Sequence, residues 1–380
     1  MSSRSSRNIS SDTLPRLRFT KEDVEHYHEV SDACLAEVLE KYEEYLYKGK
    51  RHVDTQRWKT VKSRENVVVY RERSTSDADL SDQSLSSSSS SSSGVVYHSR
   101  HDPNAAVETV SGAIVSGPGA ALAAGTKIPV MICTATMPGR LEDAMYGSYV
   151  DDAATFRRRS AYEQDLADDI GMLGVFNRPS VKDPFQFMGL TWILRSFPGL
   201  GAVVKRRDFL LLQRIGLSKT SKGELIGFTI TQSVPHRDLP ELSKYDIIRA
   251  KMSMCTIYRQ MEGQVDVFVQ IVMQPGGHAL NYFMIQETAT SIMSVGKPMD
   301  VAQKKKLFWL MRKNALDTSM GASGSSRVCS KCSVTKKLVI DATEKTVIIR
   351  PFNFCIGCTL TARSYASLQV HAEELAQRRK

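Results

Sequence analysis

Four of the seven cysteines form the most specific chemical pattern in the chain. Cys329 and Cys332 make one Cys-x-x-Cys pair, and Cys355 and Cys358 make a second, with residues 333–354 between them. Each pair presents two thiolates to one ion, and two pairs complete the tetrahedral coordination that zinc prefers. The spacing therefore predicts one zinc ion on a four-cysteine site. Unliganded thiols or a redox pair are the alternatives.

The elements around these cysteines must hold the two pairs together. The segment LVIDATEKTVIIR, residues 338–350, predicts a hairpin between them, and residues 359–380 predict a final polar helix. We expect a module over 327–380, joined to the rest of the chain by a flexible linker at 317–326. A segment with so little apolar core needs an additional cross-link, such as a bound metal ion, to fold stably.

The remaining cysteines and the composition describe an ordinary folded domain. Cys34, Cys133 and Cys255 lie among apolar residues and are predicted to be buried thiols. At 42% hydrophobic and 24% charged residues, most of the chain can fold around a core. The formal net charge of +10 favours anionic partners such as acidic lipid headgroups, and a merely solvated basic surface is the alternative.

The sequence offers no segment for secretion or for crossing a bilayer. The N-terminal MSSRSSRNISS has no apolar stretch of the kind a signal peptide needs. The nearest candidate for a membrane span, residues 112–133, contains Pro118, Lys127 and Pro129. We expect a cytoplasmic protein with reduced thiols, and peripheral association with endomembranes is a further expectation.

The N-terminal half alternates between patterned and unpatterned segments. Residues 1–18 are rich in serine and arginine and are predicted to be disordered, as is the serine-rich insertion at 74–106. Between and after them the patterns predict four elements: a helix over 21–47, a hairpin over 58–73, a strand over 128–136 and a helix over 141–149.

The clearest pattern predicts an antiparallel sheet in the second half. Residues 208–215, 225–233, 247–261 and 264–274 are rich in Val, Ile, Phe and Leu and are separated by short polar turns. A further strand is predicted at 192–197, and a basic amphipathic helix over 299–316 closes the domain. The predicted class is α+β.

These segments, in this order, resemble the START family of steroidogenic-acute-regulatory-related lipid-transfer domains. The resemblance rests on WKTVKSRENVVVYRER, TMPGRLEDAMY, VKRRDFLLLQ, SVPHRDLPELSKYDIIRA and the closing helix. It covers residues 19–316, interrupted by the serine-rich insertion. It implies a helix-grip fold, in which a curved antiparallel sheet wraps around a long C-terminal helix and a tunnel between them holds one lipid.

The resemblance also suggests which side chains would line the tunnel. Polar candidates for the lipid headgroup are Arg207, Asp208, Arg249 and Gln270. Apolar candidates for the tunnel wall are Trp192, Phe209, Leu211, Phe228, Ile230, Met254 and Phe268. Structural ion pairs are the alternative for the polar set, and ordinary core packing is the alternative for the apolar set.

Entry of a lipid requires a gate. In similar proteins, loops such as residues 234–245 gate the tunnel together with the closing helix. Lys304, Lys305 and Lys306 on that helix are predicted to rest on an anionic membrane, and a solvated helix face is the alternative.

The cysteine module resembles the second half of a FYVE finger, through VCSKCS, two strands and a last Cys-x-x-Cys. Complete FYVE fingers bind two zinc ions with eight ligands, and a basic R(R/K)HHCR motif binds phosphatidylinositol 3-phosphate. The first half and any HHCR motif are absent from this sequence, so phosphoinositide recognition is not implied. Weak electrostatic association with membranes and a protein contact through the module remain as expectations.

These observations favour a binding protein that transfers or senses a lipid. The alternative is a signalling adaptor, with the START-like domain as scaffold and the zinc module contacting proteins. An enzyme is not expected, because the sequence has neither HExxH nor GxSxG. A nucleic acid is not expected as a partner, because the basic residues are dispersed and the cysteine module lacks interleaved aromatic residues.

Overall fold

A computed structural model describes residues 9–73, 117–124, 128–165, 167–180, 182–196, 205–277, 281–319 and 333–378. The predicted disorder of 74–106 and most of the predicted linker lie outside these residues. The predicted disorder of 1–18 is wrong for residues 9–18, which include the 3-10 helix Ser11–Thr13. Ile9 and Leu17 are buried, and the backbone N–H of Ser11 donates to Asp169 over 2.7 Å. Two buried apolar side chains thus hold this segment in place.

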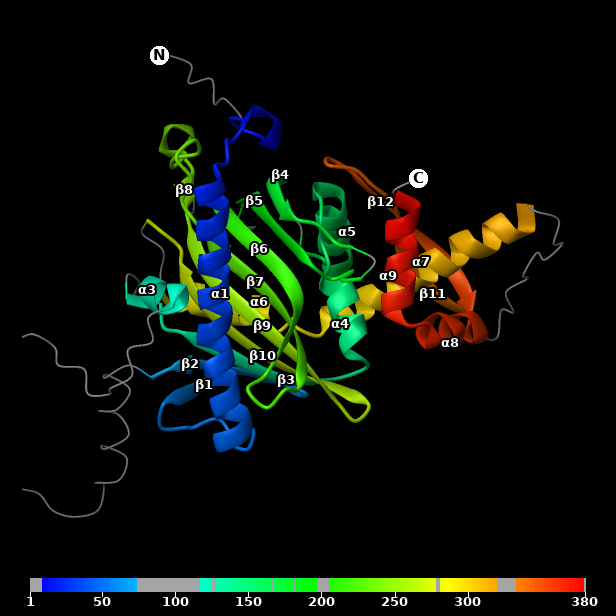
Figure 1. The fold of residues 1–380 in the computed structure, drawn as a ribbon, viewed down its shortest axis with the longest axis horizontal. Helices are drawn as coiled ribbons and strands as arrows, with labels where there is room; N and C mark the ends of the chain where they lie inside the picture. The colour runs from blue at the N-terminus through cyan, green and yellow to red at the C-terminus, as the bar shows by residue number, and fades with distance from the viewer. Residues whose placement is uncertain are drawn as a thin grey trace, which may run out of the picture.

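One curved, ten-stranded sheet forms the body of the protein, and it confirms the α+β prediction (Figure 1). Its strand order is β1-β2-β3-β10-β9-β7-β6-β5-β4, with every neighbouring pair antiparallel, and the short β8 pairs in parallel with β6. The strands are β1 (Trp58–Arg64), β2 (Val67–Glu72), β3 (Met131–Pro138), β4 (Asp169–Asn177), β5 (Phe187–Arg195), β6 (Arg207–Lys219), β7 (Leu225–Ser233), β8 (Ile248–Arg249), β9 (Lys251–Met261) and β10 (Gln264–Gln274).

Both faces of this sheet are covered, which explains why its strands are apolar on both sides. In β10, Val265, Val267 and Val269 face one cluster of buried side chains, and Phe268 lies in another on the opposite face. Alternate residues of a strand point to opposite faces. Both faces of β10 therefore carry apolar side chains, because each packs against its own layer of buried side chains.

Helix α1 (Lys21–Glu43) covers one face and crosses the strands in Figure 1. The side chain of Thr20 caps its first turn by accepting from the N–H of Asp23 at 3.1 Å. A π-helical turn, Glu44–Lys48, extends the helix to the predicted end. The short α3 (Pro118–Ala124) lies beside it, and the N–H of Gly119 donates to the buried carboxylate of Glu37 on α1.

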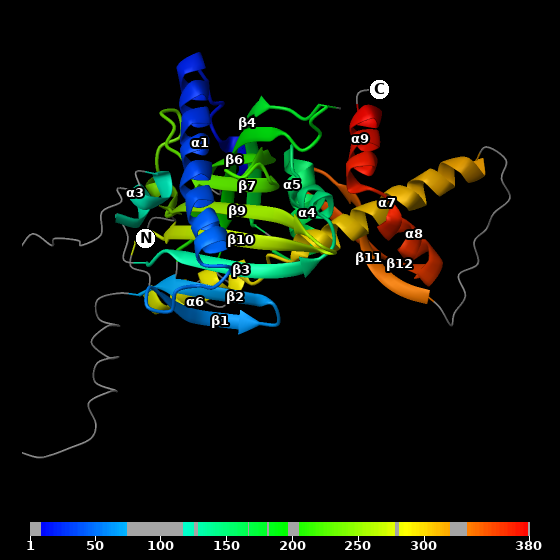
Figure 2. The same cartoon turned by 60° about the horizontal axis from the view of Figure 1, so that its bottom comes forward.

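Four helices lie on the other face or at its end: α4 (Leu141–Ser148), α5 (Ala153–Glu163), α6 (Asn281–Ile292) and α7 (Lys297–Ser319). Helix α6 packs on the sheet through Ala289 and Ile292, which share a cluster with the valines of β2 and β10. Helix α7 contains the predicted closing helix, but it packs against α4 and α5 and extends beyond the sheet (Figure 2). On this face α6 lies against the sheet beside the β1–β2 hairpin, and this helix was not predicted from the sequence.

The C-terminal residues pack against this same end of the body. They form β11 (Ser333–Ala342), β12 (Val347–Cys355), α8 (Ile356–Ser364) and α9 (Ser367–Arg378). The antiparallel β11–β12 pair confirms the predicted hairpin. The predicted single helix over 359–380 is wrong, because Tyr365 adopts an extended conformation and separates two helices. Leu338, Ala362 and Val370 are buried in the same cluster as the body's core, so the module shares that core.

None of the helices within the described ranges is long and apolar enough to cross a membrane.

Candidate functional site

A large hollow in the described part of the chain lies between the β1–β2 hairpin and α6. It has a volume of about 680 Å³. Its apolar lining comes from Val61, Ile128, Pro129, Val130 and Ile285. Ligand sites of small molecules commonly occupy about 300–1,000 Å³ and combine apolar walls with a few polar groups. This hollow has the size and composition of a binding site for a small amphipathic molecule.

Positive side chains dominate the edge of this hollow. Lys59, Arg71 and Arg73 line it together with one carboxylate, Glu72. That carboxylate is engaged outside the hollow, since Arg57 forms an ion pair with it at 3.1 Å. The hairpin is tied to α6 where Lys62 donates to Thr290 over 3.0 Å. An anionic group would be favoured at this edge by charge.

A second hollow, of about 320 Å³, lies beside the end of α1 on the opposite face of the sheet. Tyr45, Trp58, Ile132 and Phe268 supply its apolar lining. Phe268 and Trp58 belong to the cluster of buried side chains beneath α1. The two hollows are therefore separated by the sheet itself.

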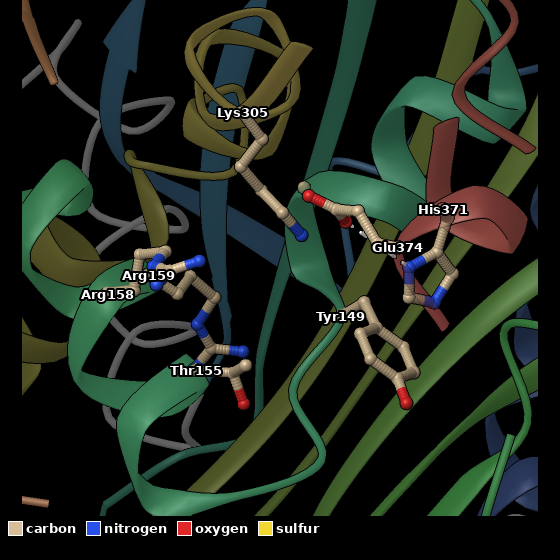
Figure 3. Close-up of a pocket in the computed structure, with 8 residues that line it drawn as sticks. Tyr149, Thr155, Arg158, Arg159, Lys305, His371 and Glu374 are labelled. Atoms are coloured by element: carbon tan, nitrogen blue, oxygen red, sulfur yellow. Dashed lines mark ion pairs between the residues drawn. The ribbon is translucent and has the colours of Figure 1, made fainter. Parts of the chain in front are cut away.

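The third space is a gap where the C-terminal module meets the body. It is lined by Tyr149, which follows α4, by Lys305 of α7 and by residues of α5 and α9 (Figure 3). Its volume of about 10 Å³ accommodates only a single water molecule. Figure 3 shows His371 beside Glu374, and the Nδ1 and Oε2 atoms of the two side chains lie 3.8 Å apart. We interpret this gap as part of a packed junction.

Burial controls the ionisation of the groups in this junction. It lowers the pKa of His371, whose ring is 2% exposed and lies 2.8 Å from the carbonyl oxygen of Pro184. Burial alone would raise the pKa of Glu374, but His371, Lys305 and Tyr146 together bring it below its ordinary value. The Tyr146 hydroxyl donates to Glu374 at 2.9 Å, and burial raises the pKa of that tyrosine. The junction favours a neutral histidine beside a charged glutamate.

The side chains predicted to line a lipid tunnel are divided between the two faces of the sheet. Phe209, Leu211 and Met254 lie on the α6 face, within or against its core cluster. Phe228, Ile230 and Phe268 lie on the opposite face, beneath α1. A single tunnel on one face cannot be lined by both sets, so lipid contact stays a prediction for the first three.

Trp192 and Arg249 meet at a buried carboxylate on the α1 side of the sheet. Asp208 is fully buried and accepts from the indole Nε1 of Trp192 at 2.9 Å and from Nε of Arg249 at 3.0 Å. Neighbouring apolar residues around Trp192, among them Leu190 and Leu210, form a further cluster on this side. Arg249 therefore forms a structural ion pair with Asp208, which was the alternative to its predicted contact with a lipid headgroup.

The side chains of the two other polar candidates, Gln270 and Arg207, also make their contacts within the protein. Gln270 is buried and donates to Oε1 of Glu37 over 2.8 Å, beneath α1. Arg207 is 3% exposed, and its Nε contacts the carbonyl oxygen of Pro275 at 3.4 Å. Burial lowers the pKa of Arg207. Neither of these residues lines the large hollow.

The predicted gate and membrane contact differ from the structure. The loop at 234–245 packs through Val234, Leu239 and Leu242 against the α1 side of the sheet, away from α6. On α7, the Lys306 ammonium is fully buried 2.7 Å from Asp143. Lys305 donates to the carbonyl oxygen of Tyr146, and Lys304 pairs with Asp300. These lysines contact the protein, so the predicted membrane surface on this helix is wrong.

The cysteines fall into a buried group and a C-terminal group. Cys34, Cys133 and Cys255 are buried, as predicted, and burial raises the pKa of Cys34 and Cys133 to about 12. Cys355 is the last residue of β12 and caps α8, and its Sγ accepts from the N–H of Cys358 at 3.2 Å. Cys329 and Cys332 lie outside the described residues, and no cluster of metal-binding side chains occurs within them. However, β12 pairs Cys355 with Ser333, the residue that follows Cys332.

Sequence reasoning missed the residues that line the large hollow. The hairpin was predicted, but the direction of its side chains was not. A signal for α6 was present, because Met284, Thr288 and Ile292 recur at helical spacing. Their burial in the structure corresponds to this periodicity.

Comparisons with known proteins give only distant similarities. No protein-family model and no curated protein sequence matches this chain. Solved structures that match include START or StAR-related lipid transfer domains. Human STARD10 is 10% identical, with 73% of this chain and 84% of that chain covered and a TM-score of 0.40. Human StAR-related lipid transfer protein 5 is also 10% identical, covering 72% and 97%, with a TM-score of 0.41.

A StAR-related lipid transfer protein fragment from Xanthomonas axonopodis is 12% identical, with 64% of this chain and 96% of that chain covered and a TM-score of 0.37. Similarity at this level assigns no ligand. The function must therefore be inferred from the geometry of this chain itself.

Proposed function

We propose that this protein binds the hydrocarbon part of a single lipid in the hollow between the β1–β2 hairpin and α6. The observation that carries the proposal is the hollow of about 680 Å³ between a curved sheet and a helix. Its apolar lining would remove an alkyl chain from water, which contributes about 0.8 kcal/mol per buried CH₂. Its positive edge favours an anionic headgroup, such as the carboxylate of a long-chain fatty acid.

A longer chain would reach beyond the hollow to the apolar core on this face. Phe209, Leu211 and Met254 belong to the same cluster as the residues of α6, and we propose them as further contacts. At the mouth of the hollow, Tyr282 on α6 is 76% exposed and lines the opening. We propose that lipid enters beside this tyrosine. The role is binding for transfer or sensing, without catalysis.

Two matched substitutions test the site. Val61→Phe places a larger side chain in the large hollow and should weaken the binding of oleate by about tenfold or more. Val53→Phe places the same side chain in the smaller hollow on the opposite face and should leave oleate affinity unchanged. Calorimetric titration of both variants provides the measurement. Equal affinities of wild type and Val61→Phe would contradict the assignment.

For the C-terminal module we propose one zinc ion held by Cys329, Cys332, Cys355 and Cys358. Two features of the described residues fit this group: the turn in which the Cys358 N–H donates to the Cys355 sulfur, and the pairing of Ser333 with Cys355. In this pairing Ser333, the residue after Cys332 in the sequence, lies beside Cys355. A zinc ion there would join the start of β11 to the end of β12.

The same module carries exposed aliphatic side chains. Ile348, Ile349, Ile356 and Leu360 are 44–56% exposed. Residues 321–380 also hold ten lysines and arginines against four acidic residues. Exposed aliphatic groups within a basic segment suit peripheral contact with an anionic endomembrane from the cytoplasmic side. The alternative is an adaptor whose module contacts a protein.

Sedimentation with liposomes separates these two roles. Leu360→Ser with Ile356→Ser should reduce co-sedimentation with phosphatidylserine-containing liposomes, because both substitutions remove exposed apolar area. Leu225→Ser, on the body and away from the lipid hollow, serves as the matched control, because Leu225 is 50% exposed. Unchanged sedimentation of the double variant would remove the membrane contact and favour the adaptor.

A further inference from the structure

The smaller hollow, on the sheet face opposite the proposed lipid site, has the construction of a second ligand site. Its volume is about 320 Å³, at the lower end of the range for small-molecule sites. Tyr45, Val53, Trp58, Ile132 and Phe268 form its apolar lining. The proposed lipid site does not use any of these side chains.

Aromatic rings form the floor of this hollow. Phe268 is 2% exposed, and its ring centroid lies 5.5 Å from that of Tyr45 and 5.6 Å from that of Tyr42. Trp58 is 9% exposed, and the guanidinium of Arg57 lies 5.3 Å from the centre of its ring. Rings at these separations pack through offset or tilted contacts, and a further ring can join them in the same way.

An unusual stretch of backbone forms the wall of the hollow. Helix α1 ends in the π-helical turn Glu44–Lys48, a form often found at functional sites. Lys50 and Arg51 follow with φ angles of 48° and 66°, in the left-handed region that side chains other than glycine seldom adopt. Two such residues in succession require support from the surrounding structure.

Buried side chains supply that support. The Arg51 Nη2 donates to the fully buried carboxylate of Asp266 at 2.7 Å and to the Thr136 hydroxyl at 3.0 Å. The Tyr42 hydroxyl donates to the other oxygen of Asp266 at 3.0 Å. The backbone N–H of Arg51 donates to the carbonyl oxygen of Tyr45, within the lining itself. The wall is thus anchored to the sheet, and the hollow is formed before any ligand arrives.

The charges around the hollow are mixed. Lys41 pairs with Glu37 at 3.0 Å, and Arg57 pairs with Glu72 at 3.1 Å. The other charged residues of the lining, Glu44, Lys48 and Asp54, include both signs. This balance gives no strong preference for a charged ligand.

We propose that this hollow binds a small, uncharged aromatic molecule of one or two fused rings, packed against Trp58 and Phe268. The site is independent of the proposed lipid site, because the sheet separates them. Its ligand would be recognised by ring contacts and by the size limit of the hollow.

Indole resonances provide a direct test, because the chain has three tryptophans. Trp192 and Trp309 lie in other clusters of buried side chains. Titration of the full-length protein, labelled with ¹⁵N-tryptophan, with 2-naphthol should shift the indole N–H signal of Trp58 saturably. The signals of Trp192 and Trp309 should stay in place. Trp58→Phe identifies the resonance.

Substitutions at Val53 locate the bound ring. Val53→Phe should weaken 2-naphthol binding by about tenfold, and Val53→Leu, which adds less volume, should have an intermediate effect. Val61→Phe, in the lipid hollow, should leave the Trp58 titration unchanged. Unmoved Trp192 and Trp309 signals report that each variant is folded. A Trp58 signal that does not shift, or that shifts equally in Val53→Phe, would overturn the proposal.

Discussion

The ammonium group of Lys306 lies 2.7 Å from the carboxylate of Asp143, and both side chains are buried. Lys306 also donates to the carbonyl oxygen of Tyr365 at 3.1 Å, and the Ser367 hydroxyl donates to Asp143 at 2.6 Å. One ion pair therefore connects α4, α7 and the segment between α8 and α9. This pair ties the C-terminal module to the sheet domain.

Removal of the lysine should destabilise the protein strongly. Lys306→Ala leaves Asp143 as a buried charge without its cation, which costs about 3–5 kcal/mol in the free energy of unfolding. Lys304→Ala is the matched control on the same helix, because its pair with Asp300 is partly exposed and contributes about 1 kcal/mol or less. Urea unfolding of both variants measures the difference. Equal losses would contradict the structural role of Lys306.

The buried pair of Asp208 and Arg249 should behave as a structural element without a role in lipid binding. Arg249→Ala should lower the free energy of unfolding by about 3 kcal/mol, because it leaves the carboxylate that Trp192 contacts without its cation. Oleate affinity should stay unchanged, since the pair lies on the α1 side of the sheet. Arg237→Ala, which removes a more exposed pair with Asp23, is the control. A loss of oleate affinity in Arg249→Ala would contradict this prediction and show that Arg249 contributes to lipid binding.

The stability of the protein should fall as the pH drops below about 6.5, the ordinary pKa of histidine. Burial holds the pKa of His371 below that value in the folded protein, so the unfolded chain binds a proton first. The loss begins at the unfolded pKa and ends at the folded one, with a slope of at most about 1.4 kcal/mol per pH unit. Burial is the main cause of the lowered pKa, and Lys305 lowers it further, whereas Glu374 and the carbonyl oxygen of Pro184 raise it. Tyr146 and Tyr149 pack against the ring.

The variant His371→Gln should lose this slope. His26→Gln is the control, because the side chain of His26 is 61% exposed. Denaturant unfolding between pH 7.5 and pH 5.0 checks both variants. The same pH dependence in wild type and His371→Gln would show that another group is responsible.

Zinc removal should loosen the C-terminal module. Purified protein should contain about one zinc ion per chain by elemental analysis, and a strong chelator should speed proteolysis within residues 321–380. Cys355→Ser should reproduce the effect of the chelator, and Cys34→Ser, in the buried cluster beneath α1, should not. Metal-free protein with an unchanged cleavage pattern would contradict the four-cysteine site.

The hydrophobic pattern of the sequence was enough to predict most strands, because they are apolar runs separated by short polar turns. The predicted strand at 264–274 has the limits of β10. The pattern could not predict which residues of a strand face α1 and which face α6. Phe268 and Val269 are equally apolar, and only the packing of α1 and α6 distinguishes their surroundings. For this reason the predicted lining residues are divided between two faces.

The structure also reverses an interpretation based on residue type. A run of three lysines suggested a membrane surface, because lysine is seldom buried without a partner. Asp143 is such a partner, but it lies far away in the sequence and close only in the fold. The large hollow escaped prediction for a similar reason, since its walls come from a hairpin, a loop and a helix that lie apart in the sequence.

The dependence of affinity on alkyl chain length tests the proposed lipid site most directly. In a series of saturated fatty acids titrated below their micellar concentrations, each added CH₂ should tighten binding about fourfold until the hollow is filled, following about 0.8 kcal/mol per buried CH₂. Val61→Phe should end this rise at a shorter chain. An affinity that does not change with chain length, or the same series in Val61→Phe, would contradict lipid binding between the hairpin and α6.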